Sequence, residues 1–347
     1  MNRRFLILAE GNFGPLSSKT ANACIRYCSH EVIAVLDSTQ SGKSAYDVLG
    51  FGGAIPVVSS YEQARPLSPR ALLIGIAPAG GQFPASWRTI VCDALRDGLD
   101  VWSGLHTMLG DDIEFAALAR VSGSTIRDLR RAPADLDIAT GLVRELQATI
   151  VLTVGTDCNI GKMTTQLQVR DAVRALGHRV NFAATGQTGI LIEGRGIGVD
   201  AVIADFMAGA AERLTVEAAR DADIVLVEGQ GSLMHPAYSG VTLGLMHGAL
   251  PHAMVLCTQP TRTTIHRYPW VPIPPLKEVV TLYEQAMRHV QPSPVIALAL
   301  NTFDMTERDA HASIERAQSE TGLPATDPVR CDPIIIARAI EAFHAAR

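Results

Sequence analysis

Short apolar runs alternate with amphipathic stretches along the first part of the chain. The runs cover residues 5–9, 32–36, 71–76 and 99–102, and each leads into a Gly-, Ser-, Asp- or Pro-containing loop, such as residues 77–81. Apolar positions recur at helical spacing between them, most clearly over residues 17–27 and 87–97. Strands that alternate with helices predict an α/β unit with a parallel sheet, and such sheets bind ligands at the carboxyl ends of their strands.

The same alternation continues in the second part of the chain. Strands are predicted in the apolar run before Gly155 and at residues 179–184, 201–204, 223–227, 254–257, 294–300 and 328–330. Helices are predicted at residues 136–147, 163–176 and 333–346. The proline-containing stretch Arg131-Ala-Pro-Ala-Asp135 closes the first part. The sequence therefore predicts two domains, residues 1–135 and 136–347.

The stretch with the clearest chemistry begins the second domain. In Thr149-Ile-Val-Leu-Thr-Val-Gly-Thr-Asp-Cys-Asn-Ile-Gly-Lys-Met-Thr-Thr165 an apolar run enters a loop that ends in Gly-Lys, and a helical pattern follows. Glycines allow successive N–H groups to point at one anion, and the helix adds the positive end of its dipole. Lys162 supplies a mobile positive charge for phosphate oxygens. The pattern predicts a phosphate-binding loop, the alternative being a tight turn without a ligand.

This loop departs from the common G-x-x-x-x-G-K-[ST] spacing in two places. Gly155 stands one residue early, and Met163 occupies the position of the hydroxyl that binds magnesium. Thr164 is one residue further along the helix, which is a rotation of roughly 100°. The spacing resembles the phosphate loop of dethiobiotin synthetase, whose lysine is followed directly by threonine. Phosphate binding without a required metal is the prediction.

Composition limits the other classes of function. The 347 residues are 47% hydrophobic and 19% charged, and the net charge of −5 predicts no nucleic-acid surface. No apolar run has the length of a membrane span, and the N-terminal run predicts a first strand in place of a signal peptide. The six cysteines include no C-x-x-C pair, so reduced thiols and a cytoplasmic location are expected.

One feature of the first domain suggests a dinucleotide site. Asp37 follows the second apolar run, where dinucleotide-binding folds place an acidic residue. However, the first loop, Glu10-Gly-Asn-Phe-Gly14, lacks the G-x-G-x-x-G pattern. NAD binding is therefore not the favoured interpretation.

Polar residues with possible catalytic roles follow the apolar runs of the second domain. Asp205 and Glu228 each end a predicted strand, where an acidic residue of a phosphate-loop protein can meet a metal or orient water. His235 and Tyr238 follow Glu228 closely and offer a base and a phenol. For each residue the alternative is an ordinary loop position or a helix cap.

Two later strand ends carry possible ligand-binding residues. Arg262 can hold a carboxylate through its planar fork, and Asn301, in Asn301-Thr-Phe-Asp304, can pair with an adenine edge. Tyr268-Pro-Trp-Val-Pro-Ile-Pro-Pro275 between them predicts a stiff loop beside a cleft or subunit contact.

Taken together, these motifs resemble the D-glutamate N-acetyltransferase family, and the resemblance covers nearly the whole chain. They are Gly155-Thr-Asp-Cys-Asn-Ile-Gly-Lys-Met-Thr-Thr165, Ala184-Thr-Gly-Gln-Thr-Gly189, Asp205-Phe-Met-Ala-Gly-Ala210, Glu228-Gly-Gln-Gly-Ser232, His235-Pro-Ala-Tyr-Ser-Gly240, Ser18-Lys-Thr-Ala21, Leu36-Asp-Ser-Thr39 and Ser103-Gly-Leu-His106. Cys257-Thr-Gln-Pro-Thr-Arg262 departs from the pattern, in which His-Glu replaces Thr-Gln.

The resemblance implies an α/β protein with an N-terminal Rossmann-like parallel-sheet domain and a C-terminal P-loop NTPase-like, doubly wound domain. It implies acetyl transfer from acetyl-CoA to the amino group of a D-amino acid, typically D-glutamate, in D-amino-acid catabolism. The partners expected are small-molecule substrates and further copies of the chain in a homo-oligomer of two or more subunits, with no nucleic acid and no membrane.

The chemical properties of the side chains suggest a role for each of the named residues. The candidates for catalysis are Glu228, His235, Tyr238 and Asp205. The candidates for binding acetyl-CoA are Gly155, Thr156, Asp157, Cys158, Asn159, Ile160, Gly161, Lys162, Met163, Thr164, Thr165 and Asn301. The candidates for binding the acceptor are Arg262, Gln187, Gln230 and Ser232. No metal ligand is assigned. The alternative functions are an ATP- and magnesium-dependent ligase or kinase of the dethiobiotin synthetase type and a nucleotide-sensing module without catalysis.

Overall fold

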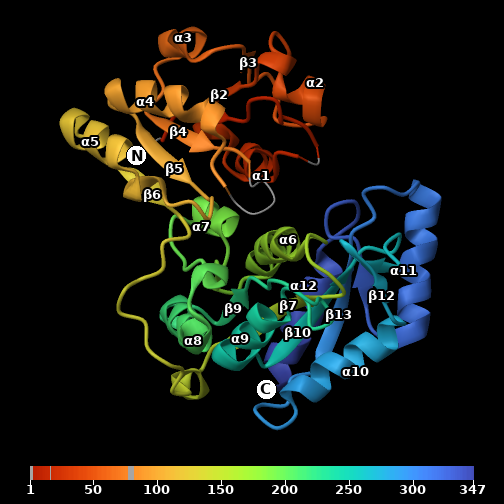
Figure 1. Cartoon of the computed structure of the whole chain (residues 1–347). Coiled ribbons are helices and arrows are strands. Elements are labelled where there is room, and N and C mark those ends of the chain that lie inside the picture. Colours follow the sequence, from red (N-terminus) through yellow and green to blue (C-terminus); the bar gives the residue numbers. More distant parts are fainter. Residues whose placement is uncertain (1–2, 16, 77–81) are drawn as a thin grey trace. The chain divides into compact units, whose positions relative to one another are not determined.

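The computed structural model describes residues 3–15, 17–76 and 82–347, and the loop predicted at residues 77–81 lies outside this range. The chain divides into two compact units (Figure 1). The first unit holds Met1–Arg131 together with Ile190–Ala201, and the second holds Ala132–Gly189 and Val202–Arg347. A short segment from the middle of the chain therefore belongs to the first unit.

The first unit is built on a parallel sheet with strand order β3-β2-β1-β4-β5-β6, the arrangement of Rossmann-type folds. Its strands are β1 Phe5–Leu8, β2 Val32–Leu36, β3 Val57–Val58, β4 Ala71–Ile74, β5 Asp100–Ser103 and β6 Ile126–Asp128. Its helices are α1 Lys19–Tyr27, α2 Ala45–Leu49, α3 Tyr61–Ala64, α4 Arg88–Arg96 and α5 Ile113–Ser122. The central strands β1 and β4 are buried along their full length, which explains their continuous apolar runs.

The second unit contains another parallel six-stranded sheet, with the order β14-β13-β10-β7-β9-β8. Its strands are β7 Thr149–Gly155, β8 Val180–Ala183, β9 Ile224–Val227, β10 Ala253–Thr258, β13 Val295–Leu300 and β14 Ala325–Thr326. Its helices are α6 Lys162–Ala175, α8 Ala204–Ala219, α9 Ser239–Ala249, α10 Leu276–Met287, α11 Glu307–Thr321 and α12 Ile334–Ala346. The predicted α/β class of both parts is confirmed.

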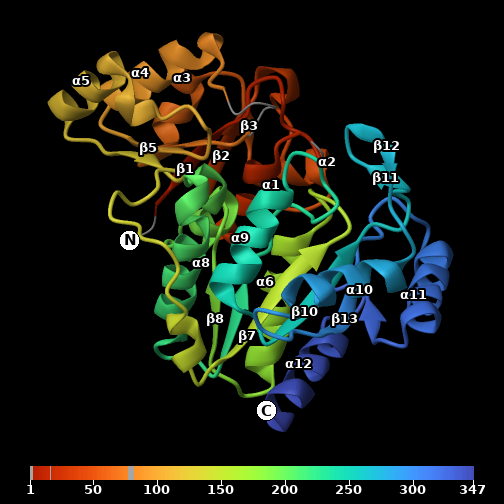
Figure 2. The same cartoon turned by 60° about the horizontal axis from the view of Figure 1, so that its bottom comes forward.

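Helices cover the second sheet in two layers, as the right-handed crossover rule requires. Helices α6 and α12 pack against each other, while α8 packs against α9 and α10 against α11 (Figure 2). β7 lies between β10 and β9 and is buried at every position. The loop after β7 therefore leaves the middle of the sheet at its carboxyl edge, with polar strand-end loops on both sides.

Helix α7 Gln187–Glu193 begins in the second unit and ends in the segment 190–201 of the first. Leu191 is fully buried in the hydrophobic core of the first unit, and its carbonyl oxygen accepts a hydrogen bond from Arg3. Arg130 and Asp200 form an ion pair within the same unit. The motif Ala184-Thr-Gly-Gln-Thr-Gly189 therefore contains the start of a helix, at Gln187.

Two predicted elements are absent because side chains capture the backbone. Residues 136–147 are irregular apart from one short 3₁₀ turn at Leu142–Glu145, since the buried carboxylate of Glu212 accepts the N–H groups of Thr140, Gly141 and Leu142. The last strand is β14 instead of residues 328–330, because Asp327 Oδ1 accepts the N–H groups of Val329 and Arg330 in a turn.

The predicted strand at residues 201–204 is also wrong. This segment contains a 3₁₀ turn, Val199–Ala201, and then enters α8 at Ala204. The last residue of the run already belongs to the helix, and the sheet ends at β8 on this side. Asp205 therefore lies in the first turn of α8 and does not end a strand.

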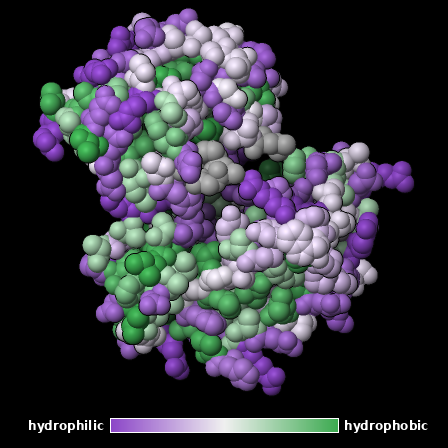
Figure 3. Space-filling model, in the orientation of Figure 1, coloured by the Kyte–Doolittle hydropathy of each residue, from purple (hydrophilic) through white to green (hydrophobic). Residues whose placement is uncertain are grey.

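The proline-rich segment forms an edge hairpin. β12 Tyr268–Pro272 pairs in antiparallel fashion with β11 Thr264–Ile265, outside both large sheets. Within the described residues no helix is long and apolar enough to cross a membrane. On the face seen in Figure 3, hydrophilic side chains predominate and hydrophobic ones gather in patches on the second unit.

Candidate functional site

The phosphate loop has its glycine at position 155 because of the way Ile160 packs. Ile160 is buried, and a Cβ atom added to Gly155 would lie 2.7 Å from its Cδ1 atom and 3.3 Å from Lys162 Nζ. Thr156, where the common motif has glycine, is fully buried and donates its N–H to Cys257 O at 3.0 Å. The displaced glycine is therefore a requirement of close packing inside this loop.

The loop presents backbone donors at the start of α6. Within the described residues, the N–H groups of Ile160 and Gly161 donate no hydrogen bond. Helix α6 starts directly after them, and a helix leaves its first N–H donors without partners inside the helix. Lys162 is the first residue of α6, and its Nζ atom donates to Asp157 O at 2.7 Å across the loop. This arrangement is the one expected of a phosphate-binding loop, and phosphate binding here stays a prediction.

Asp157 is the buried anchor of the loop. Its side chain is fully buried, and its carboxylate accepts the N–H of His266 at 2.7 Å, the N–H of Cys158 at 2.6 Å and Arg262 Nη1 at 2.8 Å. Burial by itself raises the pKa of Asp157, but these three donors outweigh it and hold the pKa below the ordinary value. The negatively charged carboxylate therefore holds the phosphate loop against the β11–β12 hairpin.

Arg262 bonds to the same loop. Its Nη1 atom donates to Asp157 Oδ2 and to Cys158 O, both at 2.8 Å. No hydrogen bond from its Nε or Nη2 atom to another described residue is present, so one edge of the guanidinium is available to an anionic ligand. The predicted contact with a substrate carboxylate stays a prediction, now for this remaining edge.

His235 is buried beside the loop. Its side chain is 2% exposed, and its ring centroid lies 4.5 Å from that of Tyr238 and 5.1 Å from that of Tyr268. Its Nδ1 atom accepts the N–H of Ala237 at 3.1 Å, which places the proton of the neutral ring on Nε2. Burial lowers the pKa of His235, with Asp157 opposing and Lys162 adding to the shift, so the ring is neutral at pH 7.

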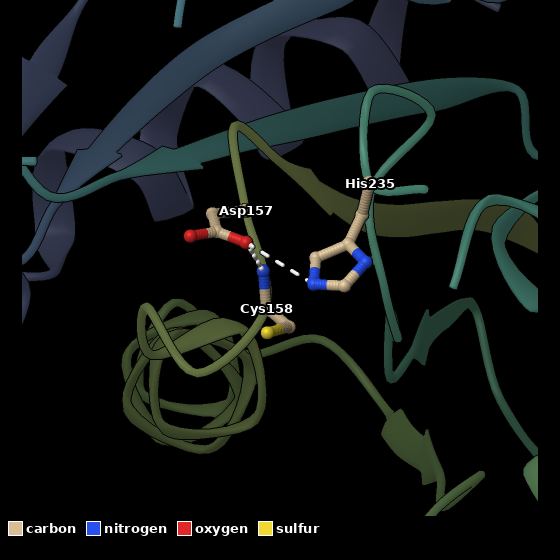
Figure 4. A group of neighbouring side chains, drawn as sticks. All are labelled: Asp157, Cys158 and His235. Carbon is tan, nitrogen blue, oxygen red and sulfur yellow. Dashed lines mark hydrogen bonds and ion pairs between the residues drawn. The ribbon is translucent and has the colours of Figure 1, made fainter. Parts of the chain in front are cut away.

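The imidazole is turned toward the loop. Figure 4 shows one ring nitrogen facing Asp157 and Cys158, and the distance from Nε2 to Asp157 Oδ1 is 3.9 Å. Asp157, Cys158 and His235 offer three possible metal-ligand atoms within 4.8 Å of one another. The arrangement does not fit a dication well, because Nε2 carries the proton and the cations Lys162 and Arg262 adjoin the group.

Glu228 follows β9 and is buried. Its Oε2 atom accepts the N–H groups of Thr185 at 2.9 Å and Gly186 at 3.0 Å. Gln230 closes the same loop, since its Nε2 atom donates to Thr185 O at 2.5 Å. The geometry shows Glu228 and Gln230 holding the loop that leads into α7, a contact that the sequence pattern did not reveal.

Two further residues join these loops, and sequence reasoning missed both. The fully buried Tyr283 of α10 donates its hydroxyl to Gly155 O at 2.7 Å and accepts the N–H of Leu233 at 3.1 Å. Thr153 of β7 accepts the N–H of Gly229 at 3.0 Å. Tyr283 lies in no recognisable motif, and Thr153 belongs to the apolar run before the loop, so only the fold shows these contacts.

The remaining predicted residues lie along the carboxyl edge of the second sheet. The side chain of Asn301 adjoins Gly161, with Nδ2 3.7 Å from a Cβ atom placed there, so it is beside the phosphate loop. Ser232 is buried, and Gln187 is half-buried at the start of α7. Tyr238 is 52% exposed, and Asp205 is exposed in the first turn of α8. Among the described residues, Asp205 forms no hydrogen bond or ion pair with the phosphate loop.

The strand-end acid of the first unit has a structural role. Asp37 is fully buried and accepts the N–H of Phe13 at 2.7 Å, the N–H of Thr39 at 2.9 Å and the hydroxyl of Thr39 at 2.6 Å. Its carboxylate closes the loop after β1 and is engaged by the protein itself.

Both parts of the chain match models of one protein family. Residues 137–335 match the family described as a domain of unknown function, the DUF1611 P-loop domain, and residues 38–132 match its Rossmann-like N-terminal domain. The chain belongs to the DUF1611 family. A crystal structure of a DUF1611 family protein from Anabaena variabilis superposes with a TM-score of 0.94 and 40% identity, over 98% of this chain and all of that one.

Curated relatives of this DUF1611 chain carry a functional name. A protein of Tritonibacter scottomollicae named D-glutamate N-acetyltransferase is 41% identical over 78% of this chain and 80% of its own length. A protein of Pseudoalteromonas sp. with the same name is 35% identical over 77% of this chain and 80% of its own. The resemblance seen in the sequence motifs is thereby confirmed.

Proposed function

We propose that this protein is an N-acetyltransferase that moves an acetyl group from acetyl-CoA to the amino group of an acidic D-amino acid, with D-glutamate as the first candidate. The observation that carries the proposal is the 41% identity, over most of both chains, to a protein named for this reaction. The anion site of the phosphate loop supports it, because coenzyme A offers a diphosphate and a 3′-phosphate to such a loop.

The length of coenzyme A constrains where transfer takes place. The extended pantetheine arm has a length of roughly 15 Å, about that of four extended residues. Neighbouring strands lie about 4.8 Å apart, so Glu228, one strand from the phosphate loop, is too near to meet the thioester of an extended donor. If the loop holds the diphosphate, the acetyl group lies more than two strands away.

The position of Asn301 suggests in which direction the pantetheine arm runs from the phosphate loop. An adenine read by Asn301 would lie on the β13 side of the phosphate loop, and the arm would then run the opposite way, past Gln230 and β8. Gln187 starts α7 at the end of β8, and α8 begins at the same edge because its other end leads into β9. Asp205, exposed in the first turn of α8, is the candidate on this side for accepting the proton of the acceptor's ammonium group.

The acidic acceptor needs a cationic partner for its side-chain carboxylate. The free edge of Arg262 remains the candidate, and a folded pantetheine arm would bring the acceptor to it. An acceptor at the β8 end would use another cation. An Arg262→Lys variant therefore distinguishes the two placements, because it should weaken acidic acceptors more than neutral ones only if Arg262 binds the acceptor.

The direct test is a turnover assay on the purified protein. Acetyl-CoA with D-glutamate should release free CoA thiol and give N-acetyl-D-glutamate by mass spectrometry, with L-glutamate and neutral D-amino acids as comparison acceptors. Calorimetry should show binding of acetyl-CoA. Tight, magnesium-dependent ATP binding without any CoA binding would overturn the proposal in favour of a ligase or kinase.

Lys162→Ala sharpens this test. Loss of a charge-assisted contact of about 1.5–3 kcal/mol should raise KM for acetyl-CoA by roughly one to two orders of magnitude. Lys277→Ala, at an exposed lysine at the start of α10, is the matched control and should leave KM unchanged. Equal KM values in the two variants would show that this loop does not bind the phosphates of acetyl-CoA.

A further inference from the structure

His235 presents a hydrogen-bond donor whose partner is missing from the protein. Its Nδ1 atom accepts the N–H of Ala237, so Nε2 carries the proton of the neutral ring. Nε2 lies 3.9 Å from Asp157 Oδ1, a distance that is too long for a hydrogen bond. Within the described residues Nε2 makes no hydrogen bond. The side chain is nevertheless buried, with only 2% of its surface exposed.

The position of the ring is built into the site. Tyr283 joins Gly155 at the base of the phosphate loop to Leu233, two residues before His235. Tyr238 and Tyr268 pack against the imidazole from two directions. A buried ring held by both a backbone bond and two aromatic neighbours has little freedom to turn its Nε2–H elsewhere.

Two familiar roles do not suit this tautomer. A general base would need a lone pair on Nε2, and a metal ligand would need the same lone pair together with an acceptor for Nδ1–H. Here Nδ1 meets a donor, the N–H of Ala237. The cations Lys162 and Arg262 on the loop also favour an anion over a cation in this space.

We infer that Nε2–H of His235 donates to an oxygen of the phosphate group held by the loop of residues 155–162. The groups around that oxygen would be the loop N–H donors, the Lys162 ammonium and the His235 imidazole. The carboxylate of Asp157 is also nearby, and its charge is balanced by Arg262 and the N–H of His266. Naming coenzyme A as the source of the phosphate rests on the proposed function, whereas the phosphate contact itself does not.

This role differs from catalysis at the thioester because of distance. The pantetheine arm separates the diphosphate from the acetyl group by roughly 15 Å when extended. A side chain that contacts the diphosphate therefore affects the binding of acetyl-CoA and has no counterpart contact in S-acetylpantetheine, which lacks both the diphosphate and the nucleotide.

The experiment compares His235→Phe with His235→Gln. Phenylalanine keeps a ring between the two tyrosines and removes the donor, while the glutamine side-chain amide can return an N–H near the position of Nε2. Calorimetry with inorganic pyrophosphate, adenosine 3′,5′-bisphosphate and ADP measures the phosphate contact without any turnover. Circular dichroism and thermal melting confirm that both variants are folded.

The expected result is a roughly tenfold weaker affinity of His235→Phe for pyrophosphate and for adenosine 3′,5′-bisphosphate, largely recovered in His235→Gln. A preference for adenosine 3′,5′-bisphosphate over ADP identifies coenzyme A as the source, and the reverse preference identifies a nucleoside diphosphate. In turnover, kcat/KM for acetyl-CoA should fall about tenfold relative to that for S-acetylpantetheine.

Three outcomes would overturn the inference. They are unchanged pyrophosphate affinity in folded His235→Phe, equal losses of kcat with both acetyl donors, and zinc binding by the native protein that both variants abolish. If the native protein transfers no acetyl group, the proposed function fails while the calorimetric result still decides the phosphate contact.

Discussion

At the scale of single residues, the site is held by a few buried polar groups that satisfy one another. Asp157 connects the phosphate loop to Arg262 and to the backbone of His266, and Tyr283 connects it to the segment before His235. Each of these contacts replaces a hydrogen bond to water that burial removed, so the loss of one partner leaves the other unsatisfied. The loop is therefore shaped before any ligand arrives.

The Asp157 contacts predict a pH-dependent loss of stability. Asp157→Asn should lower the free energy of unfolding at pH 7 by about 1.5–3 kcal/mol, because Arg262 loses its charged acceptor. The native pKa of Asp157 is below its ordinary value of 3.8, so its stabilisation is complete above that value and is lost as pH falls through the native pKa.

Urea unfolding at pH 7, 5 and 3 measures this difference. The gap between the native protein and Asp157→Asn should be constant from pH 7 to 5 and shrink toward pH 3. Asp221→Asn, at an exposed carboxylate, serves as the control and should show a small effect at each pH. A gap that does not change with pH would show that the charge of Asp157 contributes nothing.

Met163 predicts turnover without magnesium. A thioether is a poor ligand for a hard cation, and acetyl transfer leaves the phosphates of the donor uncleaved. The initial rate with acetyl-CoA and D-glutamate should be the same in EDTA and in added magnesium. A rate abolished by EDTA and restored by magnesium alone would establish a metal site. Met163→Thr, which supplies the missing hydroxyl, tests whether magnesium then strengthens ADP binding.

At the scale of elements, β7 and the loop after β9 are packed too closely to tolerate a side chain. Gly229 is the second residue after β9, and a Cβ atom there would overlap the carbonyl oxygen of Thr153 in β7. The close approach lets the N–H of Gly229 reach Thr153 and brings Glu228 to the start of α7. The Glu-Gly-Gln-Gly motif is thus explained by backbone packing at the sheet's carboxyl edge.

Gly229→Ala should destabilise the second unit by about 3 kcal/mol or more, because the backbone of a central strand cannot move aside. Gly240→Ala is the matched control, since Gly240 lies in α9 with nothing within 4 Å of an added Cβ atom. Alanine at that helical position should be neutral or stabilising by up to about 1 kcal/mol. Similar melting temperatures for the two variants would contradict the packing argument.

At the scale of the whole molecule, the chain order and the compact units do not coincide. Residues 190–201 belong to the first unit, although the phosphate loop and α6 precede them in the sequence. Leu191 fills part of the first unit's core, and Asp200 pairs with Arg130 there. The first unit is therefore incomplete when the chain is cut after residue 131.

Leu191→Ala should destabilise the first unit by about 2–5 kcal/mol, the usual cost of removing a buried leucine side chain. Leu142→Ala, at a leucine that is 52% exposed, should change stability by less than about 0.5 kcal/mol. In a Trp270→Phe background, the fluorescence of Trp87 and Trp102 follows the first unit during urea unfolding. Equal midpoints for the two leucine variants would place Leu191 outside this core.

The sequence by itself determined the α/β class, the position of the phosphate loop and most of the central strands. These features depend on local pattern, because a strand buried on both faces is a continuous apolar run and a phosphate loop is fixed by glycine and lysine spacing. The family resemblance rested on the same motifs. Residues 136–147 and 201–204 were predicted wrongly because local pattern does not show that Glu212 captures one segment or that α8 absorbs the other.

Only the tertiary structure decided what each polar residue faces. Arg262 bonds to the loop, Glu228 holds the start of α7, and His235 carries its proton on Nε2, each through partners distant in sequence or hidden in the backbone. Tyr283 lies 128 residues from Gly155 and has no motif around it. Hydrogen bonds and burial are properties of three-dimensional neighbourhoods, so residue type and spacing could nominate these side chains without assigning their contacts.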